Sequence, residues 1–174
     1  MSAASIRPAT EADLPAILAI NNEVIANTTA VYSYAPHTLD MRQQWFTERR
    51  AGKWPVIVAE QDGEVVGFGA IGPFRAWPAY KYTGEHSLHV RADQRGKGVG
   101  KALLSALVQE AEKMPLRTLI GGIDAANGQS MALHAKHGFV ACARIRDAGF
   151  KFGRWLDLVF MQLILSGPSR PEEG

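Results

Sequence analysis

The sequence predicts one domain of mixed α/β or α+β class, with helices flanking a single central sheet. Its 174 residues suit one compact domain and are too few for two ordinary ones. Hydrophobic residues make up 47% and charged residues 21% of the chain, which is a globular rather than a disordered composition. Apolar residues recur at helical spacing in some segments and in strand-like runs in others, so both kinds of element are expected.

Four segments have the features of helices. In the first, Thr10 and Asp13 form a capping-box pattern ahead of apolar residues that recur at helical spacing as far as Ile25. Pro15 fits poorly if Thr10 is the cap, which shifts the expected start by a residue or two. The remaining helices are expected from Thr38 onward, over 98–113, and over 127–136, where Gly138 ends the last one.

Six segments have the composition of strands, namely 55–60, 64–71, 80–90, 118–123, 139–146 and 155–165. The first two flank Gln61-Asp62-Gly63, which predicts a hairpin turn. The resulting order is two helices, three strands, a helix, a strand, a helix and two strands, which is typical of one sheet with helices against it. The polar, turn-rich residues 166–174 are expected to form a flexible tail, so the domain should cover residues 1–165.

Charge and cysteine content narrow the possible functions. A formal net charge of only +2 argues against a protein that coats nucleic acid. The single cysteine, Cys142, rules out an internal disulfide and a zinc site built from cysteines. No apolar run approaches the ~20 residues of a membrane span, and the first residues lack the apolar core of a signal peptide. We therefore expect a soluble cytoplasmic protein without a nucleic-acid or membrane partner.

The most informative segment is the glycine loop, residues 95–101, between an expected strand and a long amphipathic helix. Glycines at alternate positions remove side chains where a ligand must approach the backbone. The free amides at the helix start favour an anion, and the cations between the glycines add positive charge. The loop thus has the character of a pyrophosphate-binding site; its glycines are Gly96, Gly98 and Gly100, and its cations are Arg95, Lys97 and Lys101.

Two other phosphate-binding motifs match the glycine loop poorly. A P-loop needs Ser or Thr after its lysine, whereas Ala102 follows Lys101. In the dinucleotide fingerprint the third glycine would come one residue later than Gly100, and the loop would follow the first strand of its βαβ unit rather than lie in mid-chain. The remaining alternative is a tight strand-to-helix turn without a ligand.

Arg95, Gly98 and Gly100 match the signature Q/R-x-x-G-x-G/A, so the loop resembles that of the GNAT superfamily of N-acetyltransferases. The resemblance covers about residues 6–165. Segments 80–87 and 148–155 resemble the phosphinothricin acetyltransferase branch, and segment 72–80 most resembles the methionine sulfone/sulfoximine N-acetyltransferases. A later segment resembles the second cofactor motif of the superfamily, through Asn127, Ser130, Leu133, His134, His137, Gly138 and Phe139.

This resemblance implies a GNAT fold, with a central mixed, mostly antiparallel sheet flanked by helices. It also implies transfer of an acetyl group from acetyl-CoA to the α-amine of a small amino acid such as methionine sulfone, methionine sulfoximine or phosphinothricin. Such an activity would detoxify inhibitors of glutamine synthetase. The resemblance to this branch also implies a homodimer. The aromatic residues Phe150, Phe152 and Trp155 are a candidate contact, with core packing as the alternative.

The resemblance also assigns residues to the cofactor acetyl-CoA. Relatives splay two strands beside the pantetheine arm, so exposed backbone amides there can bind it and polarise the thioester carbonyl. The residues expected beside the arm are Leu88, His89 and Val90. The pyrophosphate is expected on Arg95, Gly96, Lys97, Gly98, Val99, Gly100 and Lys101, and Asn127 is expected to bind the cofactor arm or to cap the following helix, or both.

Two residues are assigned to catalysis. Glu85 aligns with the glutamate that the branch uses as a base, and we expect it to act through water. Many members of the superfamily have a tyrosine acid where this chain has His134, so either His134 or solvent protonates the leaving thiolate. No metal site is expected, because strand alternation places His86 and His89 on opposite faces.

The acceptor pocket is expected to involve two short segments, made up of Arg75, Ala76 and Trp77 and of Glu85, His86 and Ser87. Arg75 can bind a carboxylate through two parallel hydrogen bonds. Two alternatives remain open at this point. The acceptor could be a protein N-terminus, a polyamine or another amino acid, or the protein could be a non-catalytic sensor of acyl-CoA.

Overall fold

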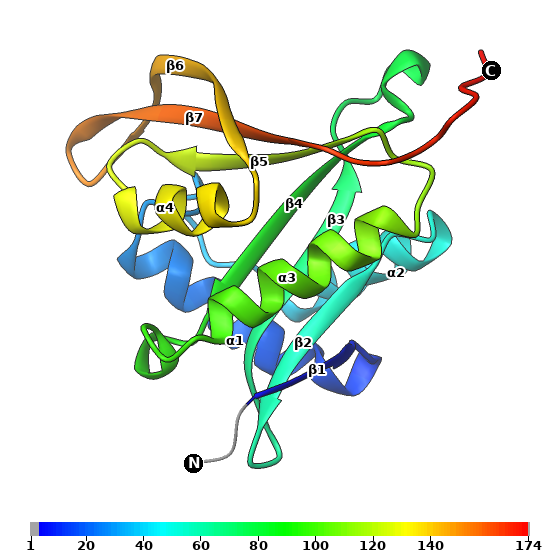
Figure 1. The fold of residues 1–174 in the computed structure, drawn as a ribbon. Helices are drawn as coiled ribbons and strands as arrows, with labels where there is room; N and C mark the ends of the chain where they lie inside the picture. The colour runs from blue at the N-terminus through cyan, green and yellow to red at the C-terminus, as the bar shows by residue number, and fades with distance from the viewer. Residues whose placement is uncertain (1–3, 174) are drawn as a thin grey trace. The chain divides into compact units, whose positions relative to one another are not determined.

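The computed structural model describes residues 4–173 (Figure 1). The described chain has four α-helices, which are α1 (Leu14–Asn27), α2 (Leu39–Ala51), α3 (Val99–Glu112) and α4 (Gly128–Lys136). Its strands are β1 (Ser5–Pro8), β2 (Val56–Gln61), β3 (Glu64–Pro73), β4 (Thr83–Val90), β5 (Thr118–Asp124), β6 (Val140–Lys151) and β7 (Arg154–Ile164). The predicted order is therefore confirmed, except that the sequence interpretation missed β1.

The strands form one seven-stranded sheet in the order β1-β2-β3-β4-β5-β7-β6. The pairs β1–β2, β2–β3, β5–β7 and β6–β7 are antiparallel, whereas β4 and β5 are parallel. The expected mixed, mostly antiparallel sheet is thus confirmed. A parallel pair needs a crossover connection, and the segment between β4 and β5 contains α3.

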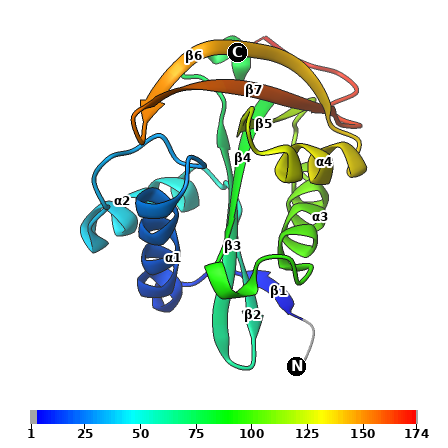
Figure 2. The same ribbon diagram turned by 90° about the vertical axis from the view of Figure 1, so that its left-hand side faces the viewer.

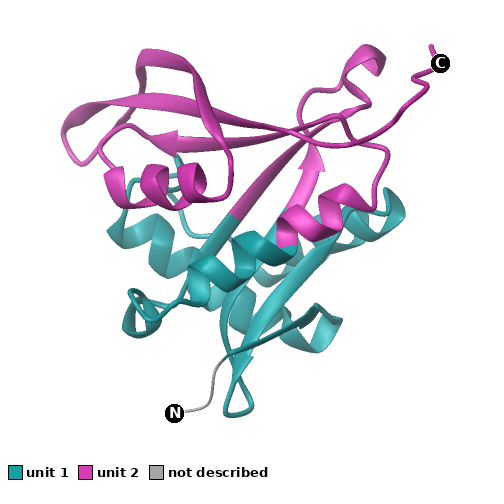
Figure 3. Cartoon of the chain, in the orientation of Figure 1, with its two compact units in different colours: residues 1–70, 88–106 teal, residues 71–87, 107–174 magenta. Residues whose placement is uncertain are grey.

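The described residues divide into two compact units (Figure 3). Unit 1 takes its residues from 1–70 and 88–106, and unit 2 takes its residues from 71–87 and 107–174. Three elements, β3, β4 and α3, contribute residues to both units. The single domain over 1–165 stays a prediction.

Unit 1 has an apolar core between two helices and strands of the sheet. Helices α1 and α2 lie side by side in both views (Figures 1 and 2). The cluster comprises Leu14, Ile17, Ile20, Phe46, Val56, Val58, Phe68 and Ala70. A 3-10 turn over Glu11–Asp13 follows the Thr10 cap, and α1 then begins at Leu14. Pro15 therefore stands in the first turn of α1, where its missing N–H leaves no bond unmade.

The predicted hairpin turn between β2 and β3 is confirmed. Both central residues have positive φ angles, 51° at Asp62 and 81° at Gly63, as the favoured two-residue hairpin turn requires. The shorter β1 escaped notice because four residues that end in Pro8 show no usable alternation.

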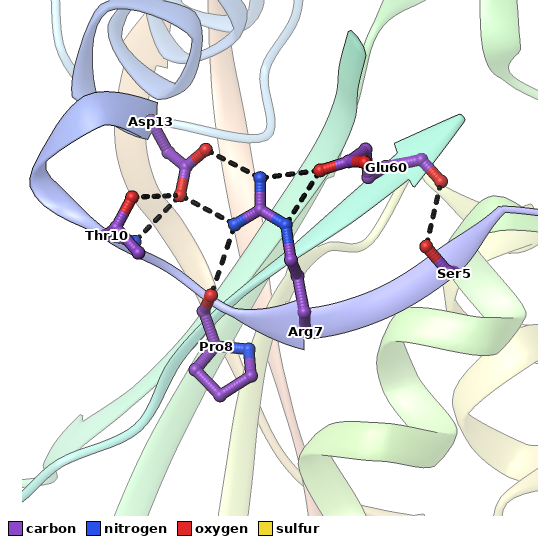
Figure 4. A network of polar contacts seen from close by, with 6 residues as sticks. All are labelled: Ser5, Arg7, Pro8, Thr10, Asp13 and Glu60. Atoms are coloured by element: carbon purple, nitrogen blue, oxygen red, sulfur yellow. Dashed lines mark hydrogen bonds and ion pairs between the residues drawn. The ribbon is translucent and has the colours of Figure 1, made fainter. Parts of the chain in front are cut away.

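A polar network joins β1 to β2 and to the turn before α1 (Figure 4). Arg7 donates from Nη1 and Nη2 to the two carboxylate oxygens of Asp13 at 2.8 and 2.9 Å, and from Nε to Glu60 Oε2 at 2.7 Å. Asp13 also accepts from the Thr10 backbone at 2.7 Å. The guanidinium of Arg7 therefore lowers the pKa of Asp13 to about 2.

Unit 2 contains the long β6–β7 ribbon, which is strongly curved (Figure 2). Its buried apolar residues include Leu119, Phe139, Leu156 and Met161. The segment after β7 makes specific contacts. Ser166 donates to the carboxylate of Glu112, and the Tyr82 hydroxyl donates to the Glu172 carbonyl at 3.1 Å. These bonds tie the predicted tail to the unit at two points.

Candidate functional site

In unit 1, the glycine loop has the backbone that its sequence predicts. Gly96 and Gly98 have φ angles of 76° and 90°, a region that L side chains rarely adopt. A Cβ at either position would meet nothing within 4 Å, so both glycines face open space. Gly98 O accepts from Ala102 N at 3.1 Å, which leaves the amides of the first turn of α3 without helical partners. This backbone can bind an anion.

The cations of the glycine loop differ in availability. The Arg95 side chain donates to Val90 O at 3.0 Å and forms an ion pair with Glu23 of α1. Its charge is therefore partly compensated. The sequence did not reveal this contact with Glu23, because the two residues are 72 positions apart. Lys97 and Lys101 are exposed, whereas the Val99 side chain is buried in the core, so Val99 has only its backbone to offer a ligand.

Along β4, His89 is partly buried and packs within unit 1. Its ring lies 5.4 Å from the ring of Phe68, centroid to centroid, and its carbonyl lies close to Gly67. Burial, together with the positive charges of Arg42 and Arg95, lowers the pKa of His89 to about 4. Neutral His89 thus behaves as a packed ring, while Leu88, His89 and Val90 still carry backbone groups along the strand.

The parallel ladder of β4 and β5 is short. It runs from Thr83–Thr118 to His86–Gly121, whereas within the described residues β4 continues to Val90 and β5 to Asp124. A ladder that ends before its strands do is consistent with the splayed strands that the family resemblance implies beside a pantetheine arm. His86 and Gly121 are the last pair in this ladder.

In unit 2, Glu85 and His86 lie on opposite faces of the strand, as alternation requires. A Cβ on Gly122 would lie 3.5 Å from Glu85 Oε1, whereas a Cβ on Gly121 would lie only 2.5 Å from His86 Cε1. The same Cβ on Gly121 would lie 3.4 Å from His134 Nε2. The predicted base Glu85 and the predicted acid His134 are therefore on different faces of these strands.

The imidazoles of His86 and His134 form a buried pair. They are 5% and 4% exposed, and their Nε2 atoms are 3.0 Å apart. His86 Nδ1 lies 2.8 Å from Ile120 O, and His134 Nδ1 lies 2.7 Å from Ser130 O. Burial lowers the pKa of His86 to about 4 and also lowers that of His134. All four ring nitrogens have protein partners, so neither ring is placed to contact an acceptor directly.

Asn127 caps α4, as one of its two predicted roles requires. Its Oδ1 accepts from Ser130 N at 3.0 Å, and its own backbone N–H donates to Asp124 O at 2.8 Å. The cap uses only the side-chain oxygen of this exposed residue and does not engage the Nδ2 donors. Capping and cofactor binding are thus compatible.

The predicted acceptor residues before β4 are exposed. The Arg75 guanidinium lies over the Phe74 ring, 4.1 Å from its centroid, and donates to Phe74 O at 2.8 Å. Phe74 packs against Tyr80 and Phe160, which supports the position of Arg75. Trp77 is 76% exposed, and Ala76 beside it is exposed too. Ser87 is also exposed, whereas His86 is not.

Over residues 4–173, no group of three or more His, Cys, Asp or Glu side chains is arranged to hold a metal ion. None of the described helices is long and apolar enough to cross a membrane. Phe150, Phe152 and Trp155 are 46%, 58% and 62% exposed, so these aromatic residues lie on the surface of unit 2 rather than in a core.

One feature of the site was missed in the sequence, namely the glycine pair of β5. Gly121 leaves room for the His86–His134 pair, and Gly122 leaves room for Glu85. Two adjacent glycines in an otherwise apolar strand are the available signal, because a strand glycine often marks close approach by another group. The contact between His86 and His134 has no such signal, since it depends on the register of β4 against β5 and on the seating of α4.

Comparison with known proteins gives a consistent result. Residues 18–139 match the model of the Acetyltransferase (GNAT) family. The L-methionine sulfoximine/L-methionine sulfone acetyltransferase of Pseudomonas paraeruginosa is 45% identical over 96% of this chain and 97% of its own.

Two solved structures are similar along nearly their whole length. The ribosomal-protein-alanine N-acetyltransferase of Brucella melitensis is 46% identical, with a TM-score of 0.91 over 92% of this chain and 99% of its own. A GNAT superfamily phosphinothricin acetyltransferase of Sinorhizobium meliloti, in complex with AcCoA, is 36% identical, with a TM-score of 0.94 over 99% of this chain and 95% of its own.

Proposed function

Since the chain belongs to the GNAT family of acetyltransferases, we propose that it transfers the acetyl group of acetyl-CoA to the α-amine of a small amino acid. The acceptors we favour are L-methionine sulfone and L-methionine sulfoximine, with phosphinothricin as a related substrate. The observation that carries the proposal is the 45% identity, over nearly the full chain, to an acetyltransferase named for the first two compounds.

The glycine loop supports binding of the coenzyme. The relative from Sinorhizobium meliloti holds AcCoA, and the loop here offers open backbone at Gly96 and Gly98 and free amides at the start of α3. We assign the pyrophosphate to residues 95–101 and the pantetheine arm to the backbone of Leu88, His89 and Val90. Asn127 Nδ2 would donate to the same arm.

For the chemical step, Glu85 is the proposed base. It would take a proton from the acceptor ammonium through water, so that the free amine attacks the thioester carbonyl. The attacking nitrogen loses its second proton to solvent, and the C–S bond of the thioester breaks to give the amide and a coenzyme A thiolate, which takes a proton from solvent. Because both nitrogens of His134 are bonded within unit 2, we do not assign it direct contact with the thiolate.

Arg75 and Trp77 are the proposed recognition residues for the acceptor. Arginine has five N–H donors in a planar fork, and the contact with Phe74 O uses one of its two terminal nitrogens. The rest of the fork suits the carboxylate of a free amino acid. The exposed aromatic residues Phe150, Phe152 and Trp155 support the further proposal of a homodimer. The cytoplasmic location stays a prediction.

The test of the proposed function is release of coenzyme A from acetyl-CoA, measured with a thiol reagent. Methionine sulfone, methionine sulfoximine, phosphinothricin, spermidine and a peptide that begins with alanine would be compared side by side. We expect fast turnover with the sulfone and the sulfoximine. Turnover restricted to the peptide would instead favour the activity named for the Brucella melitensis relative. Coenzyme binding without turnover on any acceptor would favour a sensor.

Replacing Arg75 tests how the acceptor is recognised. We expect Arg75→Ala to raise the KM for methionine sulfone at least about tenfold, because a charge-assisted pair with the carboxylate is lost. The KM for acetyl-CoA should stay the same. Exposed Arg170 provides a matched control, and Arg170→Ala should leave both values unchanged. Equal losses with methionine sulfone and with its amide, which lacks the carboxylate, would contradict this role.

A further inference from the structure

Each hydrogen bond of the buried histidine pair needs one proton, and two neutral imidazoles carry too few protons for all the contacts that the pair makes. Three contacts link Ile120 O, His86, His134 and Ser130 O in a row. Neither carbonyl oxygen can donate, so both outer contacts need a proton on nitrogen, and the central contact needs a third. Two neutral imidazoles carry only two. Burial lowers the pKa of both histidines, so two protons is the state expected near neutral pH.

The Ser130 hydroxyl decides where the two protons lie. Ser130 Oγ is 3.5 Å from His134 Nδ1 and can donate to it, whereas Ile120 O, which lies 2.8 Å from His86 Nδ1, can only accept. One of the three contacts must lack a proton, and the hydroxyl makes this the contact between His134 Nδ1 and Ser130 O. The favoured chain therefore runs from Ser130 Oγ–H to His134 Nδ1, from His134 Nε2–H to His86 Nε2, and from His86 Nδ1–H to Ile120 O. A hydrogen bond to one ring nitrogen fixes the tautomer at the other.

The surroundings leave the two rings little freedom. Phe139 packs against both, with its ring centroid 5.3 Å from that of His86 and 5.2 Å from that of His134. Gly121 closes a third side, because even a Cβ there would collide with His86. The other titratable group that acts on His134 is His137, whose positive form lowers its pKa.

The chain of contacts continues from the histidine pair to the cap of α4. Ser130 presents its carbonyl and its hydroxyl to His134 and donates its backbone N–H to Asn127 Oδ1. The last residue of β4 in the β4–β5 ladder is therefore connected, through the His134 side chain and Ser130, to Asn127, to which we assign the coenzyme arm. A shift of His86 would move the first turn of α4 and with it Asn127.

We propose that His86 is a positioning residue for the coenzyme, which holds His134, the first turn of α4 and hence Asn127 through this directional chain of hydrogen bonds. This inference rests on the proposed function, because it takes acetyl-CoA as the ligand. His86 touches neither substrate in this role. Its effect is on coenzyme affinity first and on turnover second.

The test compares three variants by calorimetric titration with acetyl-CoA and by steady-state kinetics. His86→Phe keeps a ring but loses both nitrogens, and it should weaken acetyl-CoA binding at least about tenfold through loss of a buried hydrogen bond. His86→Gln, whose amide oxygen can accept from His134, should restore most of that affinity. Lys136→Gln, at the exposed end of the same helix, should bind acetyl-CoA as the unaltered protein does. Unchanged affinity in folded His86→Phe would overturn the proposal.

Nitrogen-15 NMR of the unaltered protein tests the pair without turnover and without a variant of His86. We expect Nδ1–H on His86 and Nε2–H on His134 near neutral pH. In Ser130→Ala the hydroxyl donor is gone, so the pair should take up its third proton at a higher pH than before. The opposite tautomers, or an unshifted titration in Ser130→Ala, would refute the directional chain. If the unaltered protein does not bind acetyl-CoA, the proposed function fails, and the NMR result still reports on the pair separately.

Discussion

Glu85→Gln should lower kcat for acetyl transfer at least about 100-fold, with little change in the KM for acetyl-CoA. A positioned general base typically contributes about 10²–10⁴-fold to the rate, and glutamine cannot take up the proton. The substitution keeps the shape of the side chain against Gly122, where Glu85 Oε1 lies close to the strand. Loss of rate with intact coenzyme affinity would therefore report on proton transfer and not on folding.

The measurement is kcat over a range of pH at saturating methionine sulfone. In the unaltered protein the rate should fall at low pH as the base is protonated, and that fall should be absent from the residual activity of Glu85→Gln. Glu48→Gln, an exposed carboxylate on α2, is the matched control and should keep full turnover. Full turnover in Glu85→Gln near neutral pH would remove Glu85 from the mechanism.

As the pH falls, the protein should begin to lose stability at a pH well above the range in which carboxylates titrate. His86 has a pKa of about 4 in the folded state because it is buried, whereas an unfolded histidine titrates near ~6.5. Between these values the unfolded chain binds more protons than the folded one, so stability is lost as the pH falls through this window. His86 alone should lower the free energy of unfolding by about 2–3 kcal/mol between about pH 7.5 and about pH 4.5.

The neighbouring histidines act in the same direction. Burial also lowers the pKa values of His134 and His37. The pKa of His89 falls to about 4, but His89 is partly exposed, so it contributes less than His86 to the dependence of stability on pH. Asp13, with a pKa of about 2, adds a further loss at lower pH, because its bond to Arg7 requires the charged carboxylate.

Urea unfolding at a series of pH values checks the acid prediction. In His86→Phe, stability should depend less steeply on pH between about 6.5 and about 4.5, because the group responsible is absent. His137→Gln, at the C-cap of α4 and partly exposed, should keep the steep dependence. An equally steep dependence in His86→Phe would mean that His86 is charged in the folded protein.

The predictable parts of this protein are those set by local chemistry. Thr38 begins α2 as predicted because its hydroxyl accepts from Met41 N, a contact within one turn. The turn needs a positive φ at both central positions, and Asp62 and Gly63 are of the few residue types that tolerate it, so they form the predicted hairpin turn. In the glycine loop, residue types and spacing were enough to predict an open backbone, whereas anion binding there stays a prediction.

The parts that escaped depend on contacts between distant residues. Glu23 neutralises part of the charge of Arg95 although 72 residues separate them. His134 was interpreted as a candidate acid, but the structure pairs it with His86, 48 residues away, and buries both rings. Helical or strand periodicity describes one element at a time, so it cannot reveal which side chain of another element will occupy the space left by Gly121.

The polar network around Arg7 bears on the order in which the chain folds as it is synthesised. Residues Ser5–Pro8 are synthesised before Ile57–Glu60, with which they pair, and the carboxylate of Glu60 that Arg7 binds lies 53 residues further on. Strand β1 therefore has no sheet partner until β2 has been made. Closing this loop costs entropy before its contacts form, so we expect β1 to dock no earlier than β2 during synthesis.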